Sequence, residues 1–158
     1  MTALRFTLFD GSQMHAMADL WVESWQRAYP EIDFEARRVW LIERLTAFHA
    51  QGVLICLATH TATAQLAGFV TLDPATGHIN QLVVGLAHWG RGVGGALIQW
   101  CKDHGSSRLN LEVNADNHTA IALYQRHGFV QVGEGINPNS GRPVIQMVCG
   151  VEQAGLNR

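Results

Sequence analysis

The chain has 158 residues, of which 47% are hydrophobic and 15% are charged. This length and hydrophobic content suit one folded domain over residues 1–158 and exclude a largely disordered chain. Eleven lysines and arginines against thirteen aspartates and glutamates give a net charge of −2, so no basic excess is available for binding a nucleic acid backbone.

The first third of the chain predicts one strand and two helices. Leu4–Phe9 alternates between apolar and polar residues as a strand does, and Asp10–Ser12 then breaks the pattern and offers a helix cap. A second helix is expected from Phe34, capped by Asp33, to about Gln51, with Gly52 at its end. The first helix is indicated by apolar residues at helical spacing before Pro30, namely Met14, Met17, Trp21 and Trp25.

The rest of the chain predicts a meander followed by alternating helices and strands. Three strands come first: Val53–Thr59, Leu66–Leu72 and Ile79–Val84. A loop at Gly85–Gly92 then leads into a helix from Val93 to about His104. The remaining elements are a strand at Arg108–Val113, a helix at Asn117–His127, and strands at Phe129–Val132 and Val144–Cys149. The order βααβββαβαββ predicts a mixed α/β fold.

The most informative segment is a strand that leads through a glycine-rich loop into an apolar helix. Leu82-Val83-Val84 ends the strand, and Gly90-Arg91-Gly92-Val93-Gly94-Gly95 opens the helix. Glycine permits positive φ and close approach of a ligand, while the first helical turn presents free N–H groups. Together these features predict a pyrophosphate cradle. The alternative is that the glycines provide only a tight turn and close packing of the helix.

The same glycines also fit the dinucleotide-binding fingerprint as Gly90-x-Gly92-x-x-Gly95, with Glu112 about 20 residues further along. A dinucleotide-binding domain builds a parallel sheet from βαβ units, whereas this motif follows a meander that looks antiparallel. A phosphate-binding P-loop is excluded, since no Lys-Ser or Lys-Thr follows the glycines. A dinucleotide-binding protein is therefore the less favoured alternative.

Two motifs resemble the GCN5-related N-acetyltransferases (GNAT family). The family's coenzyme A loop is written Gln/Arg-x-x-Gly-x-Gly/Ala, and the segment Trp89–Gly94 (WGRGVG) matches it except at Trp89. The segment Leu111–Phe129 (LEVNADNHTAIALYQRHGF) is similar to the family pattern LEV…N..AI.LY…GF. The resemblance runs from about Leu66 to Phe129. It implies the GNAT-like acyl-CoA N-acyltransferase fold, a bent and mostly antiparallel sheet, splayed between the strands ending at Val84 and Val113.

The resemblance also implies an activity, the transfer of an acetyl group from acetyl-CoA to a primary amine by direct attack in a ternary complex. The backbone of the Leu82–Val84 strand is expected to bind pantetheine, and the Val84 N–H to polarise the acetyl carbonyl. The residues implied to bind the cosubstrate are Leu82, Val83, Val84, Gly90, Arg91, Gly92, Val93, Gly94, Gly95, Ala96, Asn117 and Tyr124.

Asn117 and Tyr124 are two helical turns apart and are expected to share one face of a helix. The resemblance implies that Asn117 bonds the pantetheine arm and that Tyr124 protonates the departing thiolate, a role suited to a phenol of pKa about 10. The alternatives are a helix N-cap for Asn117 and a core aromatic for Tyr124.

The general base is less well defined. Family members often carry a carboxylate where this chain has Asn80 and Gln81, and amides cannot act as bases. Glu112 takes the position of the base in the ribosomal-protein alanine acetyltransferases, which this chain resembles there. Glu112 could equally be a strand residue that anchors a loop, and His78 or a water held by Asn80 are further candidates. The missing acids also leave open a non-catalytic acyl-CoA-binding module.

The acceptor is expected to meet the first two helices and the loop 137–143. Trp21, Trp25 and Tyr29 are spaced by four and could wall a pocket, although such a stripe usually belongs to a core. Arg142 could bind an acceptor carboxylate, although an exposed hairpin arginine is the simpler interpretation. The acids expected to attract an ammonium group, unless they are solvated helix ends, are Glu23, Glu31, Asp33 and Glu35.

The remaining residues predict a cytoplasmic protein, monomeric or homodimeric, that binds no metal and enters no membrane. Cys56, Cys101 and Cys149 are far apart in apolar stretches, as buried free thiols are. The longest unbroken apolar run, Val53–Ala58, is far shorter than the ~20 residues that cross a membrane. The start of the sequence lacks an export signal.

Overall fold

The computed structural model describes residues 3–105 and 107–150, and the elements follow the predicted order βααβββαβαββ. The helices are α1 (Met14–Ala28), α2 (Arg38–Ala50), α3 (Val93–His104) and α4 (His118–Arg126), with the 3-10 turns η1 (Glu35–Arg37) and η2 (Leu86–His88). The strands are β1 (Leu4–Leu8), β2 (Leu54–His60), β3 (Leu66–Asp73), β4 (His78–Val84), β5 (Arg108–Asn114), β6 (Val130–Ile136) and β7 (Pro143–Gly150).

The strands hydrogen-bond in the order β1-β2-β3-β4-β5-β7-β6. β1 pairs antiparallel with β2, and both β5 and β6 pair antiparallel with β7. β4 pairs parallel with β5 through His78 with Asn110 and Ile79 with Leu111. The predicted mixed, mostly antiparallel sheet is therefore confirmed, and it differs from the parallel sheet of a dinucleotide-binding domain.

The chain forms two compact units, which are described separately. The first combines the residues up to Thr71 with Gln81–Leu97, and the second combines Leu72–Asn80 with the residues from Ile98 onward. The expected single domain and the expected splay of the sheet stay predictions.

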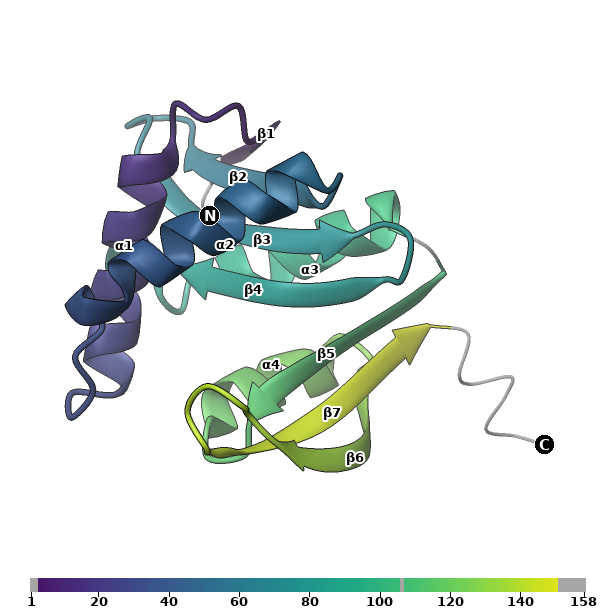
Figure 1. Ribbon diagram of the computed structural model, residues 1–158. Coiled ribbons are helices and arrows are strands. Elements are labelled where there is room, and N and C mark those ends of the chain that lie inside the picture. The colour runs from purple at the N-terminus through teal and green to yellow at the C-terminus, as the bar shows by residue number, and fades with distance from the viewer. Residues whose placement is uncertain (1–2, 106, 151–158) are drawn as a thin grey trace. The chain divides into compact units, whose positions relative to one another are not determined.

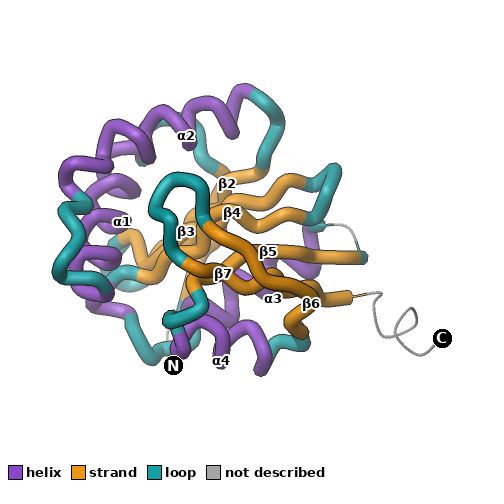
Figure 2. The backbone as a smooth tube through the Cα atoms, turned by 60° about the horizontal axis from the view of Figure 1, so that its bottom comes forward, coloured by secondary structure: helices purple, strands orange, loops and turns teal. Residues whose placement is uncertain are grey.

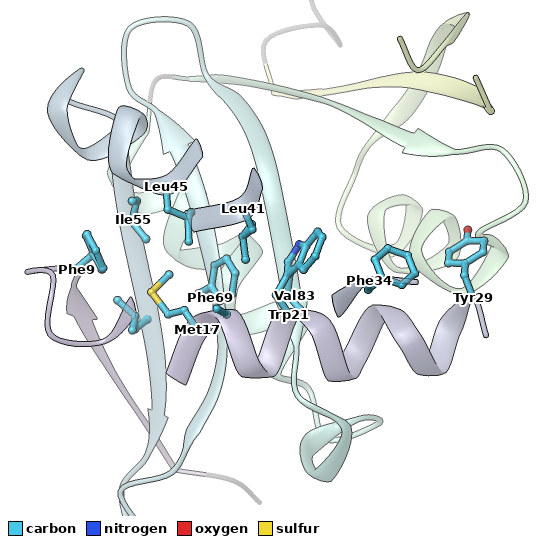
Figure 3. Close-up of a cluster of buried hydrophobic side chains, with 12 residues drawn as sticks. Phe9, Met17, Trp21, Tyr29, Phe34, Leu41, Leu45, Ile55, Phe69 and Val83 are labelled. Atoms are coloured by element: carbon cyan, nitrogen blue, oxygen red, sulfur yellow. The ribbon is translucent and has the colours of Figure 1, made fainter. Parts of the chain in front are cut away.

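The first unit buries one side of α1 and α2 against its strands. Met17 and Trp21 of α1, Leu41 and Leu45 of α2, and Phe69 of β3 converge in one cluster (Figure 3), and each is at most 4% exposed. α1 and α2 lie beside each other, and α2 crosses over β2 (Figure 1). The spacing of four residues places each helical pair on one face, and burying each large side chain contributes about 1.5–3 kcal/mol.

The starts of these two helices differ from each other in how they are capped. Asp10 accepts hydrogen bonds from the backbone N–H and the hydroxyl of Ser12, and α1 begins after Gln13 with no side-chain cap. The predicted cap for α1 was therefore wrong, because the Asp10 carboxylate is used within its own turn. Asp33 does accept the Ala36 N–H at 3.2 Å, as predicted, although this first turn is 3-10 before α2 proper.

In the second unit, α4 packs beside the strands β5 and β7 (Figure 2). The Asn117 side chain caps α4 by accepting the Ala120 N–H at 3.2 Å. The ring of Phe129, just after the helix, lies 5.6 Å from the ring of Tyr124. At the end of α4, Lys102 of α3 donates from Nζ to the His127 carbonyl at 2.7 Å. These contacts fix both ends of the helix that carries Tyr124.

Candidate functional site

The glycine loop of the first unit has the backbone conformation that an anion cradle needs. Gly90 and Gly92 have φ of +75° and +83°, where any side chain would be strained. A Cβ atom added to either residue would meet nothing within 4 Å, so the space over them is open. The first helical hydrogen bond of α3 runs from the Ala96 N–H to the Gly92 carbonyl at 3.1 Å. The N–H groups of residues 93–95 therefore have no acceptor within the helix. These residues fit a pyrophosphate group.

The end of β4 turns the polar backbone groups of Val84 away from β3. A Cβ on Gly68 of β3 would lie 2.5 Å from the Val83 carbonyl oxygen, so that carbonyl faces β3. The Gly85 N–H also faces β3, since it donates to the Ala67 carbonyl at 2.8 Å. In a trans peptide the C=O and the next N–H point in opposite directions. Both the N–H and the C=O of Val84 therefore point away from β3.

Two side chains donate hydrogen bonds to the Val84 carbonyl oxygen. The Ser24 hydroxyl of α1 donates to it at 3.0 Å, and the Trp89 Nε1–H donates to it at 2.7 Å. Trp89 is the residue that departs from the Gln/Arg of the family loop. The bond from Ser24 could not be predicted from the sequence, because Ser24 and Val84 are 60 positions apart and no spacing rule connects them.

The remaining residues predicted for the cosubstrate take ordinary places in the first unit. Val83, Val93 and Gly94 are buried, Leu82, Val84, Gly95 and Ala96 are half-buried, and Arg91 is exposed. The apolar side chains are thus mostly used for packing, and the backbone groups are what these residues can offer to a ligand.

The aromatic stripe on α1 belongs to the core. Trp21 is 4% and Tyr29 is 9% exposed, and the Trp25 ring stacks on Tyr29 and on Phe34. The Trp21 Nε1–H donates to the Gln81 Oε1 of β4 at 3.0 Å. The stripe therefore ties α1 to β4 and packs the first unit, which is the simpler of the two interpretations.

The acidic residues near the turn between α1 and α2 have partners of their own. Arg38 binds Glu35 at 2.6 Å and Asp19 at 2.7 Å, and its hydrogen bonds lower the pKa of the Glu35 carboxyl. Asp33 caps the following turn. Asp33 and Glu35 therefore act as helix-end residues, which weakens the expectation that they attract an ammonium group.

Tyr124 of the second unit is 8% exposed. Burial, with a smaller contribution from the Cys101 thiol, raises the pKa of its phenol well above the ordinary value. Among the described residues its hydroxyl has no hydrogen-bond partner. Tyr124 therefore keeps its proton over the working pH range. Asn117 acts as the N-cap, and its amide NH₂ group is left as a donor.

Glu112 and His78, the candidate bases, lie in different surroundings. Glu112 is exposed on β5, and its Oε2 lies 3.4 Å from the Gln146 Nε2 of β7. His78 Nδ1 lies 2.7 Å from Asn110 Oδ1, and Asn110 Nδ2 donates to the Thr76 carbonyl at 3.0 Å. Because Asn110 presents its oxygen, His78 donates this hydrogen bond from Nδ1, and Nε2 is the ring nitrogen on the other side. His78 precedes Val84 by a strand length of about 20 Å, which disfavours it for chemistry at Val84.

Arg142 of the loop between β6 and β7 forms an ion pair with Asp116 at 3.3 Å. The Ala115 N–H also donates to the Pro143 carbonyl at 3.0 Å. These two contacts join this loop to the one between β5 and α4, so the Arg142 guanidinium already has a carboxylate partner.

The buried imidazole of His88 is expected to make the stability of the fold depend on pH. His88 is 7% exposed, and burial, then the nearby His60 and Arg91, lowers the pKa of its imidazole. Below about pH 6.5 the unfolded chain binds a proton that the folded chain resists, so stability is lost as pH falls through the lowered pKa. We expect the urea midpoint to fall between pH 7 and pH 5, and to fall less in His88→Gln. An equal fall in both proteins would contradict this origin.

No group of three His, Cys, Asp or Glu side chains within residues 3–105 and 107–150 could hold a metal ion. No helix in the same ranges has both the length and the apolar character to cross a bilayer. Cys56, Cys101 and Cys149 are buried thiols outside any disulfide, as predicted.

The comparison with protein families gives a match over most of the chain. The profile of the "Acetyltransferase (GNAT) family" matches residues 14–129. This range holds the predicted coenzyme A loop, the strand with Glu112 and the helix with Tyr124, and it also takes in α1 and α2.

Individual relatives agree with that match. Over 83 residues, 48% of this chain and 26% of the relative, the sequence is 37% identical to the mycothiol acetyltransferase of Jonesia denitrificans. The chain matches between 16% and 29% of the length of its curated relatives.

Two solved structures show the same fold at low sequence identity. Apo-form YjaB from Escherichia coli has a TM-score of 0.74 and 19% identity, covering 93% of this chain and 97% of that chain. The structure of yncA from Salmonella typhimurium with its cofactor acetyl-CoA has a TM-score of 0.68 and 15% identity, covering 95% of each chain.

Proposed function

We propose, on the premise that this chain belongs to the GNAT acetyltransferase family, that it is an N-acetyltransferase that transfers an acetyl group from acetyl-CoA to a primary amine. The observation that carries the proposal is the end of β4. There Val84 directs its N–H away from β3, and the chain then leads through two glycines at positive φ into the open first turn of α3.

The proposal assigns the binding of acetyl-CoA to backbone groups first. The free N–H groups of residues 93–95 and the open glycine positions receive the pyrophosphate, with Arg91 exposed beside them. The backbone of Leu82–Val84 receives the pantetheine arm as an added strand would be received. Asn117 contributes the amide NH₂ group that its capping bond leaves available.

The acetyl thioester supplies the activated acyl group, and the proposal gives each residue of the chain one task. The Val84 N–H donates to the acetyl carbonyl and stabilises the negative charge that develops on its oxygen. Tyr124 holds a proton because its pKa is raised, and it donates that proton to the departing thiolate. Attack by the amine is direct, without an acyl group carried on Cys101, because that thiol is buried.

Glu112 is proposed as the general base that takes a proton from the acceptor ammonium group. Its carboxylate is exposed on β5, and its neighbour Gln146 is a neutral amide, so an amine can approach the carboxylate from solvent. The acceptor is a small molecule or a peptide with a primary amine. The buried thiols, which form no disulfide among the described residues, are consistent with a reducing cytoplasm. The proposal includes a monomer or a homodimer.

A screen of amines with detection of released thiol tests the proposed function. The panel includes amino acids, polyamines, aminoglycosides and peptides with free N-termini, each at several pH values with acetyl-CoA. We expect at least one amine to release thiol faster than the amine-free blank. The rate with that amine is expected to fall in Glu112→Gln, because the glutamine amide cannot take a proton from the acceptor. Binding of acetyl-CoA without turnover for any amine would favour a non-catalytic binding module instead.

Gly92→Ala is expected to weaken CoA binding by about tenfold. Alanine at a φ of +83° is strained, so the loop must shift, and the new methyl group projects into the open space assigned to the pyrophosphate. The measurement is the Kd for CoA by calorimetry. Gly11→Ala, at another positive φ with open space, is the matched control and should leave the Kd unchanged. Equal Kd values for wild type and Gly92→Ala would show that this loop does not contribute to CoA binding.

A further inference from the structure

The Val84 carbonyl receives two side-chain donors from different parts of the first unit. Ser24 is 5% exposed and comes from α1, and its hydroxyl donates at 3.0 Å. Trp89 follows the short turn η2, and its Nε1–H donates at 2.7 Å. Trp89 is 46% exposed, so burial of its ring does not account for its placement. The hydrogen bond to Val84 does.

These bonds fix one peptide unit. The carbonyl of the Val84–Gly85 peptide is held by Ser24 and Trp89, and its N–H is held by the Ala67 carbonyl at 2.8 Å. A carbonyl oxygen has two acceptor sites, and both are used here. Val84 therefore offers only its N–H on the side that faces away from β3, because its own acceptor is saturated.

We infer that Ser24 and Trp89 are positioning residues of the acetyl-transfer site, which saturate the Val84 carbonyl so that Val84 presents a hydrogen-bond donor alone, at a fixed angle, to the acetyl oxygen. This inference rests on the proposed function. A free carbonyl beside that N–H would bind water or an N–H of a ligand and would repel the developing oxyanion. With both donors in place, the local dipole favours the acyl oxygen.

Residue 89 offers a specific test, because the side chains of Gln and Arg, which occupy this position in the family loop, also carry N–H donors. Trp89→Phe keeps an aromatic ring and removes the donor, whereas Trp89→Gln restores a donor on a smaller side chain. We expect kcat to fall about tenfold in Trp89→Phe, as for the loss of one well-placed hydrogen bond, and to recover to within about threefold of wild type in Trp89→Gln.

The Kd for CoA distinguishes a positioning role of Ser24 and Trp89 from a role in packing the fold. Free CoA lacks the acetyl carbonyl, so its Kd is expected to stay within twofold of the wild-type value in Trp89→Phe and in Ser24→Ala. The double variant Ser24→Ala with Trp89→Phe loses both donors and frees the peptide, so its loss in kcat should exceed the product of the two single losses. Trp100→Phe, whose ring stacks on His104 at 4.3 Å, is the control and should retain the wild-type kcat.

Three results would overturn the inference while leaving the proposed function intact: an unchanged kcat in Trp89→Phe, a loss of CoA affinity equal to the loss in kcat, or single losses that simply multiply in the double variant. Melting temperatures of all variants identify any that fail to fold. If Ser24→Ala does not fold, the comparison of kcat between Trp89→Phe and Trp89→Gln still tests the inference. Failure of the proposed function itself has a different signature, namely a wild-type protein that neither binds CoA nor releases thiol with any amine.

Discussion

Tyr124→Phe is expected to lower kcat by about 100-fold while leaving the Kd for CoA within twofold of the wild-type value. The substitution removes one oxygen, and general acid catalysis by a positioned side chain contributes about 10²–10⁴-fold. The Tyr124 ring contacts Phe129 at 5.6 Å, and phenylalanine preserves that contact. Its hydroxyl has no partner among the described residues, so the variant leaves no partner unsatisfied and should fold normally.

The other tyrosine of the chain provides the matched control. Tyr29 stacks on Trp25 in the core of the first unit, so Tyr29→Phe should affect stability more than kcat. The raised pKa of Tyr124 also predicts that the wild-type kcat does not decline from loss of the phenol proton up to about pH 10, the ordinary pKa of tyrosine. Thiol release by Tyr124→Phe at the wild-type rate would show that another group or a water protonates the thiolate.

The sequence predicted the elements well where the local signals agree. The α3 bounds, Val93–His104, match the prediction at both ends, because glycines precede the apolar start of the helix and Gly105 follows its end. α4 is bounded by the Asn117 cap and by Gly128 at a φ of +91°, and both are strong local signals. The prediction of a cap for α1 was wrong because Asp10 and Ser12 are close neighbours. The Asp10 carboxylate accepts a hydrogen bond from the Ser12 hydroxyl and not from the helix.

The candidate site was predictable only in part. The glycine loop and the motif around Tyr124 are contiguous in sequence, so a spacing pattern can find them. The hydrogen bond from Ser24 to the Val84 carbonyl joins residues 60 positions apart, and it depends on the packing of α1 against β4. Likewise, a buried aromatic stripe and an aromatic pocket wall have the same helical spacing, and the ring contacts of Trp25 were needed to favour the core.

A side chain at Gly68 is expected to lower the stability of the fold substantially. The position of Gly68 in β3 is closely approached by the Val83 carbonyl of β4, and an added Cβ would lie 2.5 Å from that oxygen and 3.3 Å from side-chain atoms of Leu97 and Val93. A backbone oxygen cannot rotate away as a side chain can, so β4 itself must move. Glycine within a strand often marks such a close approach of another backbone.

Gly68→Ala is therefore expected to lower the free energy of unfolding by about 3 kcal/mol, the upper end of the usual cost of overpacking. Chemical denaturation measures this loss directly. Gly135→Ala in β6 is the matched control, because a Cβ there would make ordinary contacts of 3.6 Å and 3.7 Å with side chains of Val144 and Gln146. Its effect should stay within about 0.5 kcal/mol.

The same substitution links stability to the proposed chemistry. The direction of the Val84 N–H follows from the Val83 carbonyl facing β3, so a displaced β4 misdirects the donor to the acetyl oxygen. In the fraction of Gly68→Ala that remains folded, kcat should fall by about tenfold or more, while Gly135→Ala should keep the wild-type rate. If Gly68→Ala were stable and fully active, β3 and β4 would have to tolerate a wider separation, and Val84 would not owe its orientation to this close approach.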